Sequence, residues 1–153
     1  MAEGTTRFAA RRNLLAALRE EHELGGDSVL VDYWDAGTAN ESITLGPTIE
    51  QDETKIEATT ARPVVYIETY ELELIVWVSS QSDLGENENR AEEICNAVYR
   101  CLRHDPRIGF DGGNGFISAS ITRAGVLSGE VLNTGAATRV DLTIECKARI
   151  DTR

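Results

Sequence analysis

The chain has 153 residues, of which 41% are hydrophobic and 27% charged, and this is the size and composition of one ordinary globular domain. Twenty-six acidic and fifteen basic residues give a formal net charge of −11, which argues against affinity for nucleic acid or an anionic membrane. No apolar run approaches the ~20 residues that span a bilayer, and no apolar signal core opens the chain, so we expect the protein to stay where it is made.

The N-terminal segment is predicted to form an amphipathic helix from about Thr6 to Glu23. Phe8, Leu15 and Leu18 recur at near-helical spacing, so we place them on its buried side. The two glycines Gly25-Gly26 then favour an end to the helix, and Val29 to Trp34 is predicted to form a short strand.

Residues 46–62 are predicted to protrude from the domain as an arm. Glu41 to Leu45 and Thr54 to Thr59 alternate weakly, so we expect them either to pair as a hairpin or to form an exposed, mobile loop. The tip of this arm is acidic, with Glu50, Asp52 and Glu53 close together.

Two strands with strict alternation bracket a second amphipathic helix. The first is predicted over Val64 to Val78 and the second over Arg139 to Ile150, each with one apolar row and one mostly polar row. The apolar rows are Tyr70, Leu72, Leu74, Val76 and Val78 in the first strand, and Val140, Leu142, Ile144, Cys146, Ala148 and Ile150 in the second.

The second helix is predicted over Glu88 to His104, and Pro106 prevents its continuation. A glycine-dense turn leads into a strand at Gly115 to Arg123, with Ile117, Ala119 and Ile121 facing inward. A connection rich in glycine, Gly125 to Gly135, returns the chain into the last strand as an antiparallel hairpin. The fold class predicted is α+β, with two helices on one face of a mostly antiparallel sheet.

The sequence offers little catalytic equipment. It has two histidines, no nucleophile-elbow serine, and no His-Glu-x-x-His or Cys-x-x-Cys spacing. The run Gly109 to Gly115 lacks the Lys-Ser/Thr of a phosphate loop and the later acids of a calcium loop, so we interpret it as a turn. We expect no catalytic residue, no metal, no cofactor and no disulfide, with Cys95, Cys101 and Cys146 reduced.

Five segments, taken in order and spacing, carry a resemblance to a known family. They are Val31 to Trp34, Glu68 to Val78, Arg90 to Ile94, Leu102 to Gly109 and Cys146 to Ile150. Over nearly the whole chain this series resembles the tail-terminator, or tail-completion, proteins of long-tailed bacteriophages. Those proteins are small folds of helices against a mostly antiparallel sheet.

The resemblance implies a structural virion protein without enzymatic activity, made in the bacterial cytoplasm and built into the virion tail or neck. It would form a homohexameric ring that caps the tail tube and joins the tail to the head. Its partners would be copies of itself, the tail-tube protein and the head–tail connector protein. DNA would pass through the pore without specific binding, past a total charge of about −66 from six copies.

Within this interpretation, residues 1–153 form one domain and 46–62 its arm. Trp34, Glu50, Asp52 and Glu53 are expected at a subunit or tube interface, and Glu71 and Glu73 are candidates for the lumen of the ring. A head–tail connector or tail-tube component is an alternative of the same class. A small ligand-binding domain or enzyme is the alternative from another class, and a pocket holding paired acids would favour it.

Overall fold

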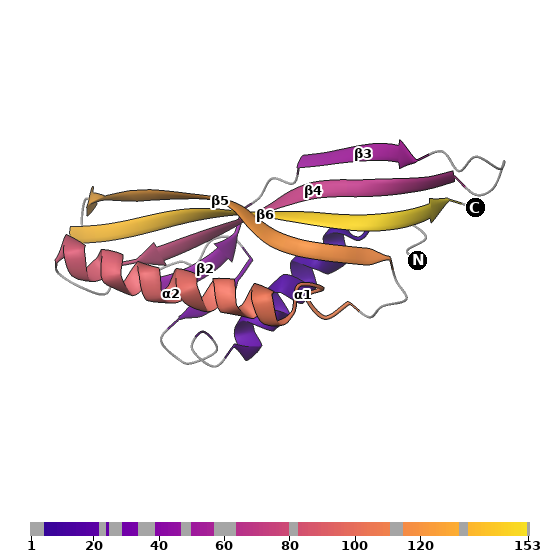
Figure 1. Cartoon of the computed structure of the whole chain (residues 1–153). Helices are drawn as coiled ribbons and strands as arrows, with labels where there is room; N and C mark the ends of the chain where they lie inside the picture. Colours follow the sequence, from indigo (N-terminus) through magenta and orange to yellow (C-terminus); the bar gives the residue numbers. More distant parts are fainter. Residues whose placement is uncertain are drawn as a thin grey trace.

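The computed structural model describes residues 5–21, 24, 29–33, 39–46, 50–56, 64–79, 83–110, 115–131 and 135–152. These residues form an α+β fold, as predicted, with two helices against one mixed but mainly antiparallel sheet (Figure 1). The elements in chain order are α1 (Arg7–Glu20), β1 (Leu30–Asp32), β2 (Glu41–Leu45), β3 (Glu50–Ile56), β4 (Val64–Val78), α2 (Leu84–His104), β5 (Phe116–Val131) and β6 (Gly135–Thr152).

The sheet has the strand order β1-β2-β4-β6-β5, and β3 pairs with β4 beside this path. Every pairing is antiparallel except that of β1 with β2, which is parallel. The longest contact joins β4 to β6 in unbroken register from Val64, opposite Thr152, to Val78, opposite Thr138. These two strands therefore form the centre of the sheet.

The predicted hairpin of Glu41 to Leu45 with Thr54 to Thr59 is wrong, because β2 and β3 both pair with β4, and the acidic segment predicted as the tip belongs to strand β3. β2 lies along the second half of β4, with Leu45 opposite Leu74, and β3 lies along its first half, with Glu50 opposite Glu71. A strand of fifteen residues has room for two short partners end to end on one edge. Figure 1 shows β3 beside the end of the sheet that α2 does not cover.

The core lies between the sheet and the two helices, and both predicted apolar rows are confirmed. Every residue of the row from Tyr70 to Val78 is buried, and so is every residue of the row from Val140 to Ile150. The helices contribute Ala10, Leu14, Leu15 and Leu18 from α1, and Ala91, Ile94, Ala97, Val98 and Leu102 from α2. The apolar side chains that alternate along the strands and those at helical spacing in the helices thus pack into one hydrophobic layer.

Both helices differ from the predicted bounds at one end. α1 ends at Glu20, and the extended backbone of Glu21 stops it before the predicted glycines, which lie outside the described residues. α2 begins at Leu84, four residues earlier than predicted, because the side chain of Asp83 accepts a hydrogen bond from the Gly85 amide at 2.7 Å. This Asp83 contact is a typical N-cap.

Strand β5 is longer than predicted, and its inward row is confirmed at Ala119 and Ile121 but not at Ile117. It continues through the predicted connection as far as Val131 and pairs with β6 along its length. Register shifts between Phe116 and Ser118 and between Ile121 and Arg123 break the alternation. Phe116 is therefore buried, whereas Ile117, predicted to face inward, is 47% exposed.

Gly46, at the end of β2, allows a close approach in which a larger residue would be crowded. Its amide donates to the backbone oxygen of Glu73 at 2.8 Å. A Cβ atom at this position would lie 2.7 Å from Glu73 Oε2 and 3.0 Å from Glu73 Cβ. The glycine therefore lets the chain leave β2 directly over the Glu73 side chain.

Candidate functional site: two edges of the sheet

The N-terminus of α1 is held by a buried carboxylate from β4. Glu68 accepts a hydrogen bond from the Thr6 backbone amide at 3.0 Å, and the hydroxyls of Thr5 and Thr6 also donate to it. The Thr6 hydroxyl lies 2.8 Å from the Tyr70 hydroxyl. Because Thr6 makes no side-chain cap of its own, Glu68 satisfies one of the orphan amides of this helix from outside.

Helix α2 is held to the sheet by an ion pair and a buried amide. Arg90 donates from Nε and Nη2 to the carboxylate of Glu41, at 3.0–3.1 Å, and from Nη1 to Glu93 at 2.9 Å. These hydrogen bonds raise the pKa of the Arg90 guanidinium. Asn87 is fully buried, and its Nδ2 donates to the backbone oxygen of Ala136 at 3.0 Å. Both contacts fix the start of α2 over β2 and β6.

One edge of the sheet is basic and aromatic. Phe8 is 55% exposed, although its spacing predicted burial, because the side of α1 that carries Ala10 and Leu14 faces the sheet instead. The Arg7 guanidinium lies 5.3 Å from the centre of the Phe8 ring, and the Arg11 guanidinium lies 5.8 Å from the centre of the Tyr33 ring. We call this surface the basic edge; it consists of Arg7, Phe8, Arg11, Arg12, Leu30 and Tyr33.

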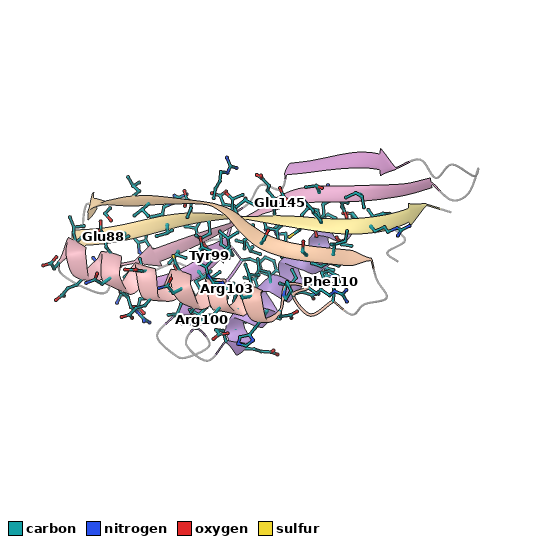
Figure 2. The ribbon with its side chains drawn as sticks, in the orientation of Figure 1. Glu88, Tyr99, Arg100, Arg103, Phe110 and Glu145 are labelled. Atoms are coloured by element: carbon teal, nitrogen blue, oxygen red, sulfur yellow. The ribbon has the colours of Figure 1, made fainter. Side chains whose placement is uncertain are left out.

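The opposite edge carries an apolar groove with an acidic rim. This groove, of about 340 Å³, lies between α2 and β5, and its lining includes Cys95, Tyr99, Ala124, Val126 and Val140. Glu88 and Glu92 of α2 also line it. Figure 2 shows Glu88 and Tyr99 on α2, with Arg100 projecting away from the sheet. We call this surface the acidic edge; it consists of Glu88, Glu92, Cys95, Tyr99 and Val126.

Strand β5 leaves its own outer edge open. Within the described ranges no strand pairs with that edge, although β5 runs from Phe116 to Val131. Val126 is 66% exposed and Leu127 is 71% exposed. A long open edge with apolar side chains is a template for pairing with another chain.

The sheet face opposite the helices carries Glu71 and Glu73, the acids predicted for a lumen. Glu71 lies directly across from Glu145 on β6, and like charges in that position repel. Arg123 Nη2 approaches Glu71 Oε2 at 3.2 Å, and Lys147 Nζ approaches Glu145 Oε1 at 3.3 Å. Glu145 is seen on this outer face in Figure 2. The face is therefore a ladder of alternating charges rather than a purely acidic surface.

The remaining predicted interface residues stay a prediction. Trp34 lies outside the described residues, and so do the side chains of Glu50, Asp52 and Glu53, whose backbone forms part of β3. The exposed apolar residues of the two edges were missed by sequence reasoning. The arginines around Phe8 were the available signal, because Arg and aromatic residues are enriched together at protein interfaces.

The thiols are arranged for packing rather than reactivity. Burial raises the pKa of Cys146 from 9.0 to about 12, and burial raises the pKa values of Cys95 and Cys101 to about 11. A thiol with a raised pKa is a poor nucleophile at neutral pH. Among the described residues no group of three His, Cys, Asp or Glu side chains could hold a metal ion, and neither helix has the length and apolarity to cross a membrane.

No family model matches the chain, and no curated protein matches it. Among solved structures the chain is similar to one described as the virion of a native gene transfer agent (GTA) particle. The TM-score is 0.55 at 16% sequence identity, and the match covers 91% of this chain and 93% of that chain. The likeness therefore concerns the fold, and it extends over nearly all of both chains.

Proposed function

We propose that the chain is a structural protein of a tailed virion, and that it is the tail terminator. In this role several copies form a ring, predicted to be a hexamer, that caps the tail tube and joins it to the head. The observation that carries the proposal is the full-length likeness in fold to a chain of the gene transfer agent virion. The element order that resembles tail terminators supports the same assignment.

The surfaces of the molecule support assembly rather than catalysis. The exposed apolar residues Val126 and Leu127 lie on an open strand edge, and Phe8 and Tyr33 lie on the basic edge. The interactions that bury polar groups, such as those of Glu68, hold helices to the sheet. A chain arranged in this way gains stability when identical neighbours cover its edges.

The outer sheet face is the proposed lining of the pore. Glu71 and Glu73 lie on it among Arg123, Arg139 and Lys147. Alternating charges hold few phosphates firmly, while the net charge of −11 on each copy repels DNA from the ring as a whole. DNA would therefore slide past this face without binding to it.

The arm is proposed to make the contact with the tail tube or with an adjacent copy. β3 is an edge strand on the first half of β4, at the end of the sheet that α2 leaves uncovered (Figure 1). Its sequence carries Glu50, Asp52 and Glu53, so it would suit a basic surface on the partner. Trp34 would add an aromatic contact to this interface.

The first experiment measures assembly directly. Light scattering of the purified chain, followed by negative-stain imaging, should show rings with six-fold symmetry, formed alone or on the ends of tail tubes. A protein that stays monomeric at high concentration and leaves tubes undecorated contradicts the proposal.

The second experiment separates the three virion roles by removing the gene from the particle-producing strain. Loss of a terminator should give tubes of uncontrolled length that are not joined to heads. Loss of a connector should give tails of normal length that stay unjoined, and loss of a tube component should give no tubes. Particles that are unchanged in length, joining and infectivity would contradict all three roles.

A further inference from the structure

Apart from Leu84 at the start of α2, the exposed large apolar side chains of the described residues divide between opposite sides of the molecule. In the sheet order, β1 and β5 are the two ends, and α1 packs beside β1 whereas α2 packs against β4, β6 and β5. Phe8, Leu30 and Tyr33 lie at the α1–β1 side, and Ile117, Val126 and Leu127 lie on β5. Each side exposes a small apolar surface that single copies leave in contact with water.

The two sides also differ in charge. From Arg7 to Leu18, α1 carries three arginines and no acid, and Arg12 projects from its exposed side. Arg11 contacts the Tyr33 ring and the Gly46 carbonyl oxygen, so within the described residues no carboxylate pairs with it. On the other side, Glu88 and Glu92 line the groove and are exposed. The basic edge is thus complementary in charge to the acidic edge.

We propose that the basic edge of one copy docks into the acidic edge of the next copy. Phe8 would fill the apolar groove between α2 and β5, and Arg12, one helical turn from Phe8, would reach Glu88 and Glu92. This proposal rests on the proposed function, because it names the contact that builds the ring. Neither edge is complementary to itself, so the contact is heterologous.

A heterologous contact has a definite consequence for assembly. Each copy has one edge of each kind on opposite sides, so copies add head to tail, and the series closes into a ring when the rotation between neighbours divides a full turn. A symmetric dimer would instead require one edge to match itself, and two basic edges or two acidic edges repel each other.

The test uses two variants that each remove one edge. Phe8→Asp with Arg12→Glu removes the basic edge, and Ala124→Asp with Val126→Asp places carboxylates in the apolar groove of the acidic edge; all four side chains are at the surface or line the open groove. Arg107→Glu, an exposed residue of the turn after α2, is the matched control for charge. Circular dichroism and thermal melting establish that each variant folds.

Each double variant alone should stay monomeric, while the Arg107→Glu control assembles as the unmodified chain does. A mixture of the two double variants should form a dimer of one copy of each and grow no further, because only one intact edge of each kind remains. Sedimentation or light scattering reports this mass against the 16.8 kDa of one copy.

Reversing both charges within one chain tests whether the lost association can be rescued. Arg12→Glu alone and Glu92→Arg alone should each weaken association by about tenfold or more. The chain that carries both changes should recover most of that loss, because the reversed edges are again complementary.

The two proposals fail in distinguishable ways. Rings that form equally well from both double variants, or a mixture that yields no dimer of one copy of each, overturn the head-to-tail contact while the tail-terminator function stands. A mixed dimer that forms as described, together with particles whose tails are unaffected by loss of the gene, supports the contact and contradicts the function.

Discussion

The two helices cover the same face of the sheet but are attached to it in different ways. α2 carries its own start signal, since Asp83 caps its first turn, and it closes with Arg103 and His104 where the helix dipole favours cations. α1 has no acid in its first turn, and one of its orphan amides is satisfied by Glu68 from β4. α2 is therefore supported by local sequence, whereas α1 depends on the sheet.

The largest expected effect is on the attachment of α1. Glu68→Ala would leave the Thr6 amide and hydroxyl buried without their main acceptor, at a cost of about 2–4 kcal/mol in the free energy of unfolding. Urea denaturation measures the loss, and hydrogen exchange should locate it in α1. Glu71→Ala, on the exposed face of the same strand, is the control and should change stability by less than about 1 kcal/mol. Equal losses in both variants would contradict the dependence of α1 on Glu68.

A smaller effect is expected for the attachment of α2. Arg90→Ala would leave the nearly buried Glu41 carboxylate without its guanidinium partner and should cost about 1–2 kcal/mol, because Arg90 itself is partly exposed. Hydrogen exchange within α2 should stay slow, since Asp83 still caps the helix. A loss of α2 protection equal to that of α1 in Glu68→Ala would show that the two helices are attached alike.

Alkaline pH should distinguish the two sites through their thiols. Cys146, which contacts Tyr70 below α1, has a pKa of about 12, whereas Cys101 on α2 has a pKa of about 11. A folded-state pKa above the unfolded value stabilises the fold below pH 9, and that contribution is lost as pH rises toward the folded pKa. Urea denaturation between pH 9 and 12 should show stability falling by up to about 1.4 kcal/mol per pH unit for each thiol.

Cys146→Ala should make this decline in stability less steep. The total loss of stability since pH 9 should differ most between the variant and the unmodified chain at the upper end of the range. A slope that is the same with and without Cys146 would contradict its raised pKa.

The smallest effect on stability is expected from the arm. Deletion of Gln51 to Lys55 removes most of an edge strand that pairs with β4 alone, so the free energy of unfolding should fall by about 1 kcal/mol or less. Assembly into rings, or onto the tail tube, should weaken markedly. A deletion variant with unchanged oligomer mass and unchanged tail joining would refute a role for the arm.

The sequence predicted those parts of the fold where one pattern decides the outcome. In the row from Tyr70 to Val78, alternation specifies which side is buried, and tertiary context cannot reverse it without exposing five apolar residues. The same pattern does not say which edge a strand joins. For that reason the prediction that β2 pairs with part of the arm as a hairpin was wrong.

Local irregularities explain the other differences. The register shift after Phe116 turns Ile117 outward, and no composition signal marks it. Phe8 fits the helical period, but the contact of Thr6 with Glu68 orients α1 so that this ring faces outward. The sequence could therefore predict which kinds of residue form the candidate interface, namely exposed aromatic and charged residues. It could not predict where on the fold they lie.

The arrangement of two short strands along one edge of β4 affects how such a chain can change over evolution. β2 ends at Leu45, Gly46 is tied to Glu73, and β3 pairs only with the first half of β4. Insertions or deletions between Gly46 and Val64 would therefore leave the register of β4 with β6 untouched. This region can be lengthened, shortened or exchanged to suit a new neighbour while the rest of the domain keeps its geometry.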